Sequence, residues 1–165
     1  MAKKTVVVID MQDYFLTKPE SQDLVPGICS LLRYATRQRW GIIFVEFGGD
    51  PTTRKILESV SGYDMVDTIK KLKMDGGDKV LYCLSEHPGW SRHLVVCGVY
   101  GDQCVEKTVC GILSLSKDVQ VDIIRDLVSP PYQLTEHTLV NQSDVQGVHK
   151  LLSVEMERTN DGATV

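Results

Sequence analysis

The chain has 165 residues, with 18 Lys and Arg against 22 Asp and Glu, a formal net charge of −4 and a pI of about 5.5. This length fits one globular domain, and 42% hydrophobic with 24% charged residues excludes a disordered, coiled-coil or collagen-like chain. The acidic balance argues against nucleic acid as a partner, because phosphate backbones bind basic surfaces. The longest uncharged runs, of about nine residues, are too short to cross a membrane.

Short β-branched runs alternate with amphipathic segments along the chain. In chain order we expect a strand at 5–9, a helix at 26–39, a strand at 41–45, a short helix at 52–60, a strand at 65–69, a helix after the turn at 75–78, a strand at 93–99, a helix at 104–115, a strand at 119–126 and a helix from 143, with a short sixth strand or a turn at 138–140.

This alternation predicts an α/β fold, a three-layer α/β/α sandwich with a doubly wound, mainly parallel sheet of five or six strands. The first run is apolar without alternation, which is typical of a strand covered on both faces. We expect one domain over residues 1–156, followed by a polar tail at 157–165.

Two segments are placed where such sheets bind ligands, at the carboxyl ends of strands beside the point where strand order reverses. Asp10 closes the first strand, and it is either a functional group at the open edge or a cap for the following loop. Cys104 follows the turn after Val99 and opens an expected helix, whose dipole and amide groups favour a thiolate and can hold an oxyanion. The alternative for Cys104 is a packed core thiol.

Cysteine usage points to a reduced setting. The five cysteines are odd in number, form no CxxC pair and follow no apolar leader, so we expect a cytoplasmic protein. Cys104 is the candidate nucleophile, and the remaining four are expected to be core thiols: Cys29, Cys83, Cys97 and Cys110.

Two stretches resemble the motifs of the isochorismatase-like cysteine hydrolases. Residues 6–15, VVVIDMQDYF, are similar to the opening strand motif, and residues 94–108, LVVCGVYGDQCVEKT, are similar to the motif that carries the nucleophile. The two occur in the family's order, about 90 residues apart, and the resemblance weakens beyond residue 128. It implies a metal-independent amidohydrolase with an Asp, Lys, Cys triad.

By motif, the resemblance makes Asp10 the base and Cys104 the nucleophile of this triad. The family's spacing puts the lysine at or near Lys71, which follows the third expected strand. Lys70 and Lys73 are close alternatives, the segment lacks the residues that usually follow the lysine, and a solvated lysine run would explain all three.

The family also has a cis peptide before the cysteine, which here would join Val99 to Tyr100 and aim the Tyr100 and Cys104 amides at a substrate carbonyl oxygen. Tyr100 is bulkier than the residue often found there, so its ring would narrow or line the pocket. Phe15 is either a second pocket wall or a core residue.

We expect no metal and no other cofactor. Nicotinamidases of this family bind a metal through an Asp and two His after the second strand, whereas residues 46–50 here are EFGGD and the first histidine is His87. The four histidines show neither HxxxH nor HExxH spacing. Glu46, Asp50 and His87 are each either pocket residues or solvated surface groups.

The leading hypothesis is therefore a cysteine hydrolase that cleaves a small-molecule amide through a thioester. The alternative is a non-catalytic relative that keeps the fold as a ligand-binding or interaction protein. A flavodoxin-like nucleotide binder is disfavoured, since no glycine-rich loop follows the first strand. We expect a homo-oligomer, a dimer or tetramer, with no membrane or nucleic-acid partner.

Overall fold

A computed structural model describes residues 2–129 of the chain, and its elements follow the expected β/α alternation. The strands are β1 Thr5–Ile9, β2 Gly41–Phe47, β3 Val66–Lys71, β4 His93–Gly98 and β5 Gln120–Val128. The helices are α1 Pro19–Gln22, α2 Leu24–Arg37, α3 Arg54–Glu58, α4 Gly77–Glu86 and α5 Glu106–Leu115, with a 3₁₀ turn at Asp13–Phe15 and a π-helical turn at Gly101–Val105.

The five described strands form one parallel sheet in the order β3-β2-β1-β4-β5. The chain runs outward from β1 through β2 to β3, then returns to place β4 on the other side of β1. The carboxyl ends of β1 and β4 therefore flank the reversal point, where parallel sheets bind ligands. The predicted fold class is confirmed; the sixth strand or turn at 138–140, the helix from 143 and the tail lie outside the described residues.

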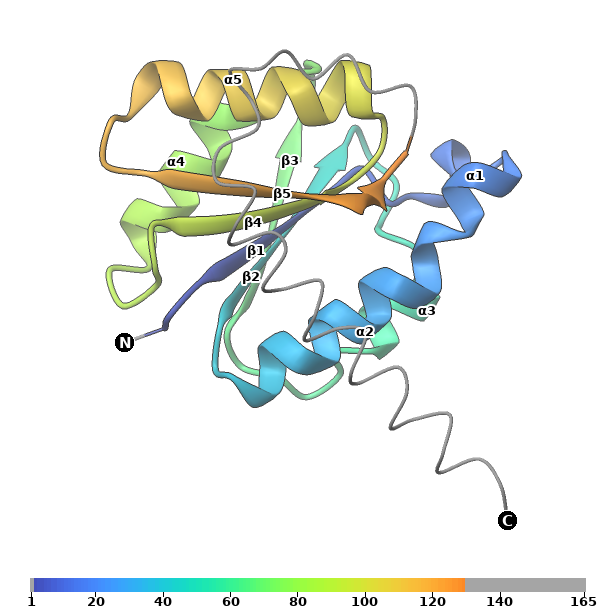
Figure 1. The fold of residues 1–165 in the computed structure, drawn as a ribbon, viewed down its shortest axis with the longest axis horizontal. Coiled ribbons are helices and arrows are strands. Elements are labelled where there is room, and N and C mark those ends of the chain that lie inside the picture. Colours follow the sequence, from blue (N-terminus) through green and yellow to red (C-terminus); the bar gives the residue numbers. More distant parts are fainter. Residues whose placement is uncertain (1, 130–165) are drawn as a thin grey trace.

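Helices cover both faces of the sheet, with α2 and α3 on one side and α4 and α5 on the other (Figure 1). Alternate residues of β1 supply the two cores: Val6 and Val8 pack on the α2 side, and Val7 and Ile9 pack on the α4 and α5 side. Because both faces are covered, the strand is apolar from Val6 to Ile9, and all five of its residues are buried.

Several boundaries differ from the sequence prediction by a few residues, and three of these differences lie in or near the segments discussed below. Strand β3 continues to Lys71, because its last residues still pair with the end of β2. Helix α2 starts at Leu24, and α1 precedes it directly. Cys104 lies in the π-helical turn before α5 instead of opening an α-helix.

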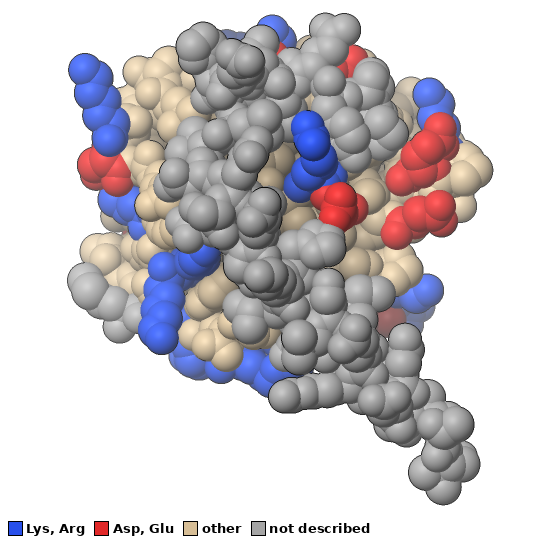
Figure 2. Space-filling model, in the orientation of Figure 1, with Lys and Arg blue, Asp and Glu red and all other residues tan. Residues whose placement is uncertain are grey.

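The described surface carries charges of both signs. In the view of Figure 2, several acidic side chains gather on the side of α1, whereas basic side chains are spread over the face, from the upper left to the lower edge. Among residues 2–129, no helix is long and apolar enough to cross a bilayer.

Candidate active site

Asp10 directly follows β1 and is 1% exposed. Its φ of 52° places it in the left-handed region, which Asp tolerates better than most residues. Its backbone N–H still donates to Val45 O at 2.9 Å, so the strand pairing continues to this residue. Burial raises the pKa of the Asp10 carboxyl, and its contacts with Cys104 and Lys71 oppose that shift.

Lys71 brings a buried positive charge to the same point. Its ammonium lies 3.0 Å from Asp10 Oδ2 and donates a 2.9 Å hydrogen bond to Met74 O. The ammonium also lies 5.3 Å from the centroid of the Phe47 ring, within the range of a cation–π contact. Because Lys71 is only 2% exposed, its charge depends on these partners for stabilisation.

The neighbouring lysines do not share this position. Lys70 is exposed, and its ammonium is directed to Gly49 O at 3.5 Å; Lys73 is also exposed. Alternation along β3 explains the difference, since Lys71 faces the α4 and α5 side of the sheet and Lys70 faces away. Of the three sequence candidates, the structure brings Lys71 to Asp10.

Cys104 completes the group from the π-helical turn after β4, and it is 7% exposed. Its thiol lies near enough to Asp10 and Lys71 for both charges to change its pKa. Burial raises the pKa of Cys104 to about 11; the Asp10 carboxylate adds to that rise, and Lys71 opposes it. In the resting site the sulfur therefore holds its proton next to a carboxylate that can accept it.

The turn before Cys104 passes very close to β1. Gly98 has a φ of +123°, and a Cβ there would meet Ile9 O at 2.1 Å, so the turn requires glycine. Val99 N donates to the same carbonyl at 3.0 Å, and the Val99–Tyr100 peptide bond is cis, at the position expected from the sequence.

Amide groups around this turn have defined partners. Gly101 N donates to Ser129 O, and the amides of Gln103 and Val105 both donate to Tyr100 O, each at 3.1 Å. This arrangement fixes the backbone that carries Cys104.

Three aromatic rings lie beside the charged group. The Phe15 ring makes edge-to-face contacts with Phe47 and Tyr100, at centroid distances of 6.2 and 6.1 Å. The Tyr100 hydroxyl donates a 2.8 Å hydrogen bond to Phe15 O. Phe15 and Tyr100, the two residues proposed from the sequence as pocket walls, are thus in contact with each other.

Hydrogen bonds from two side chains, whose role the sequence did not indicate, hold the loop after β2 in place near the end of β1. Gln12 donates to Phe47 O at 3.0 Å and to Asp50 O at 2.7 Å, and its carbonyl accepts the Phe47 N–H at 2.7 Å. Glu46 is 4% exposed and accepts the Thr52 N–H at 2.7 Å. These bonds hold the Phe47 ring against the Lys71 ammonium.

A surface pocket of about 410 Å³ opens beside this loop. Asp13, Tyr14, Asp50 and Thr52 are among its lining residues, whereas Phe15 and Tyr100 are not. Asp50 borders this pocket and is also exposed to solvent, so both of its sequence interpretations stay open.

Two other sequence interpretations need correction. Cys110 is exposed, because it lies on the outer side of α5, so it is not a core thiol; Cys29, Cys83 and Cys97 are buried as predicted, and all five cysteines are free. Glu46 is a buried, hydrogen-bonded residue and not a solvated one.

Solved structures resemble this fold at low sequence identity. N-carbamoylsarcosine amidase from Thermoplasma acidophilum is 17% identical with a TM-score of 0.66, over 82% of this chain and 88% of that one. The nicotinamidase SaPncA from Staphylococcus aureus is 17% identical with a TM-score of 0.68, over 90% and 92%. MAR1 ribonuclease from Caenorhabditis elegans is 15% identical with a TM-score of 0.64, over 92% and 73%.

A search of curated proteins gives no significant match to this sequence. The sequence profile described as Isochorismatase domain, in contrast, matches residues 4–155, which is most of the chain. This match confirms the resemblance in the two motifs around Asp10 and Cys104, and the all-parallel sheet agrees with it. The chain therefore belongs to the isochorismatase family and has the family's hydrolase fold.

Proposed function

We propose that this protein is a cysteine hydrolase that cleaves the C–N bond of a small amide without a metal ion, with Asp10, Lys71 and Cys104 as its triad. The observation that carries the proposal is the 3.0 Å contact between Lys71 Nζ and Asp10 Oδ2, next to a buried Cys104 thiol whose pKa both residues influence. A nucleophile, a proton acceptor and a fixed cation within one buried group are the parts that acyl transfer needs.

In the first step, Cys104 Sγ attacks the amide carbonyl carbon while Asp10 takes the thiol proton. Proton transfer during attack suits a thiol whose pKa is about 11, since little free thiolate exists near neutral pH. Lys71 stabilises the negative charge on Asp10 before the transfer and on the sulfur as the S–H bond breaks.

We assign the Tyr100 and Cys104 amides, in the turn from Val99, to the oxyanion of the tetrahedral intermediate. The amides of Gly101, Gln103 and Val105 already donate to protein carbonyls, which supports this choice. Two amide donors next to the nucleophile are the usual means of stabilising such an oxyanion.

Collapse of the intermediate breaks the C–N bond. Asp10 returns the proton to the departing nitrogen, which leaves as ammonia or an amine, and the acyl group stays on Cys104 as a thioester. Water then attacks the thioester while Asp10 takes a proton from it, and the thiolate leaves and is reprotonated. The products are a carboxylic acid and a regenerated site.

A small substrate is favoured by the surroundings of Cys104. Cys104, the proposed nucleophile, is 7% exposed. The rings of Phe15 and Tyr100 contact each other beside the proposed triad, so these rings are the proposed pocket walls. Two of the similar solved structures are described as an N-carbamoylsarcosine amidase and a nicotinamidase, and small amides of these kinds form the first test panel.

The second candidate is a non-catalytic, ligand-binding member of the family. The deep burial of Cys104 and the raised pKa of its thiol favour it, because both properties slow nucleophilic attack. The two candidates differ in whether a covalent acyl-enzyme forms.

The decisive experiment measures ammonia release from a panel of small primary amides and N-carbamoyl compounds, with mass spectrometry of the intact protein during turnover. We expect release with one substrate class and an acyl adduct on the Cys104 peptide. Cys104→Ser should abolish both, whereas Cys110→Ser, which changes an exposed thiol on α5, should retain both. Ligand binding without ammonia release and without an adduct would favour the second candidate.

A further inference from the structure

A second group of reactive side chains lies away from Asp10, in the first half of β3. Asp67 of β3, together with Cys83 and His87 of α4 and its C-terminal end, places three ligand-type atoms within 4.8 Å of one another. It is the one group of three or more such side chains found among residues 2–129. Asp67 precedes Lys71 by four residues, about 13 Å along an extended strand, so this group is distinct from the proposed triad.

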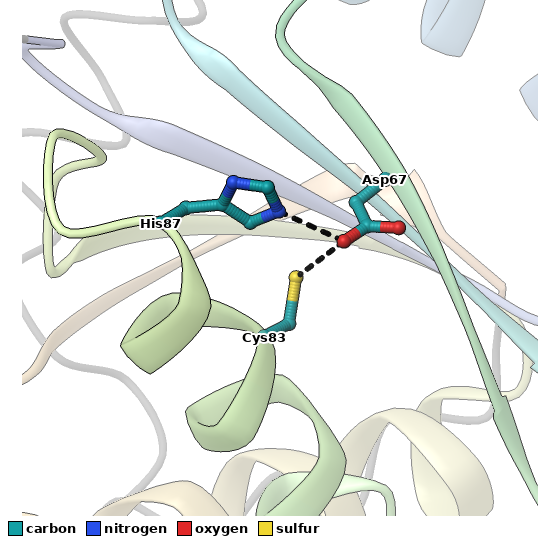
Figure 3. Close-up of side chains that lie close together, drawn as sticks. All are labelled: Asp67, Cys83 and His87. Atoms are coloured by element: carbon teal, nitrogen blue, oxygen red, sulfur yellow. Dashed lines mark hydrogen bonds and ion pairs between the residues drawn. The ribbon is translucent and has the colours of Figure 1, made fainter.

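The side chains of Cys83 and His87 meet at the Asp67 carboxylate. Both Cys83 and His87 point toward the Asp67 carboxylate (Figure 3), with His87 Nε2 at 2.8 Å and Cys83 Sγ at 3.5 Å from the same oxygen, Oδ2. Cys83 and His87 are four residues apart, a spacing that puts both on one side of a helix. His87 N still donates to Cys83 O at 3.2 Å, so helical geometry extends to this residue.

These distances are close to those around a tetrahedral zinc ion, and the sulfur and nitrogen atoms lie within 4.8 Å of each other. With ordinary Zn–S, Zn–N and Zn–O bond lengths, tetrahedral angles separate sulfur from oxygen by about 3.5 Å and nitrogen from oxygen by about 3.3 Å. The sulfur–oxygen distance already has this value, and the nitrogen–oxygen distance of 2.8 Å would open by about 0.5 Å on metal binding.

The arrangement does not suit a second nucleophilic site. In a Cys-His-Asp relay the imidazole lies between the thiol and the carboxylate, so that it can take the thiol proton. Here the carboxylate oxygen lies between Cys83 and His87. A thiol, an imidazole and a carboxylate oxygen within 4.8 Å of one another are instead a donor set that zinc commonly takes.

Outer contacts fix the orientation of the ligands. Asp67 Oδ1 accepts the Thr68 N–H at 2.7 Å, which leaves Oδ2 directed at the other two side chains. The His87 ring stacks on Trp90, with centroids 4.2 Å apart and planes 12° apart. Such supporting contacts around ligand side chains are typical of metal sites and preserve their affinity.

Access differs among the three ligands. Cys83 is 2% exposed, whereas the side chains of His87 and Asp67 are 34% and 41% exposed. An ion could therefore enter from solvent on the His87 and Asp67 side, and a water molecule could supply the fourth ligand.

We propose that Asp67, Cys83 and His87 bind one Zn²⁺ ion that fastens the edge strand β3 to α4. On binding, the Cys83 thiol releases its proton to solvent and the thiolate coordinates the metal. The ion would stabilise the strand whose last residue is Lys71, without taking part in chemistry at Cys104. The site is independent of the proposed amide hydrolysis.

The test uses the untagged full chain after removal of metals, with Zn²⁺ followed by calorimetry and by thermal unfolding, and with Co²⁺ followed by absorption. We expect one Zn²⁺ per chain, a higher Tm with zinc, and a thiolate-to-cobalt charge-transfer band. Fluorescence of Trp90, stacked on a ligand, should be quenched by Co²⁺.

Variants locate the site. Cys83→Ser and His87→Gln should each weaken zinc binding by at least about 10- to 100-fold and remove the cobalt band, whereas Cys110→Ser should change neither. The His87 side chain is partly exposed, so His87→Gln remains informative if the Cys83 variant folds poorly. Absence of saturable binding to the folded wild-type chain would overturn the proposal, as would zinc binding that His87→Gln leaves unchanged.

Discussion

The ammonium of Lys71 lies 3.0 Å from the carboxylate of Asp10, and both side chains are 1% exposed. A buried pair of this kind adds little net stability, because both ions lose their hydration. Removal of one partner is costly, because the other charge then stays buried without a counter-ion. The pair therefore makes stability and proposed chemistry depend on the same two residues.

Lys71→Met should lower the free energy of unfolding by about 3–5 kcal/mol, because it leaves the Asp10 carboxylate without a counter-ion. The Asp10→Asn/Lys71→Met double variant should lose less unfolding free energy than the sum of the two single variants, since neither charge remains. Urea unfolding of the wild type, both single variants and the double variant measures the coupling; additive losses would contradict an interaction between the two groups.

The loss of unfolding free energy in Lys71→Met should also depend on pH. Without the lysine, the folded-state pKa of Asp10 rises further above that of the unfolded chain, because burial then acts without a compensating charge. A raised carboxyl pKa means that the folded variant retains a proton to higher pH, so its deficit against wild type should shrink as pH falls through that pKa. Unfolding curves in mildly acidic and mildly alkaline buffers test the sign, and a deficit that grows in acid would contradict it.

Asp10→Asn should alkylate faster at Cys104 than the wild type while losing amide hydrolysis. Burial and then Asp10 raise the pKa of the thiol to about 11, and Lys71 lowers it. Removing the carboxylate leaves the lysine next to the sulfur, so the thiolate fraction near neutral pH should increase. Iodoacetamide labelling with peptide mapping measures the rate, and the exposed Cys110 in each sample is the internal reference. Slower labelling in Asp10→Asn would refute this account of the thiol.

Gly76→Ala should reduce kcat/KM by about 10- to 100-fold, because small displacements of a catalytic group carry a large penalty. A Cβ at Gly76 would lie 2.9 Å from Lys71 Cδ and 3.3 Å from a Val45 methyl group, so the lysine stem would have to shift. Gly49→Ala is the matched control, since a Cβ there meets no atom within 4 Å. Equal activity of the two variants on the substrate found with the amide panel would exclude Gly76 as a positioning residue.

Tyr100→Phe should raise KM several-fold with a smaller effect on kcat. It removes the 2.8 Å hydrogen bond to Phe15 O, worth about 1 kcal/mol, and loosens one proposed wall of the pocket without touching the triad. Tyr82→Phe, at a position 65% exposed, is the control. If kcat fell and KM did not change, Tyr100 would act on the chemical step and not on substrate binding.

Strand ends were the strongest signals in the sequence. Asp10 closes an apolar run and Cys104 follows another, and parallel strands bring such ends to one edge of the sheet. Both residues could therefore be proposed as candidate site residues from the sequence. Lys71 was harder to assign. It lies among Lys70 and Lys73, and strand pairing with β2 determines which of them faces inward.

Other features depend on contacts between distant segments, which local patterns do not encode. The hydrogen bond from Gln12 to Phe47 O joins residues 35 positions apart. The Phe47 ring contacts the Lys71 ammonium only because β2 and β3 pair. The proposed zinc site of Asp67, Cys83 and His87 is a similar case. The spacing of Cys83 and His87 was present in the sequence, but Asp67 joins them from another element.

Strand β3 has one neighbour, β2, among the described strands, and its side chains alternate between inside and outside. A shift of one residue in this pairing would turn Lys71 outward and present Lys70 or Leu72 to Asp10. The identity of the buried cation is thus encoded in a register, so substitutions in β2 that never touch Asp10 could exchange one lysine for another.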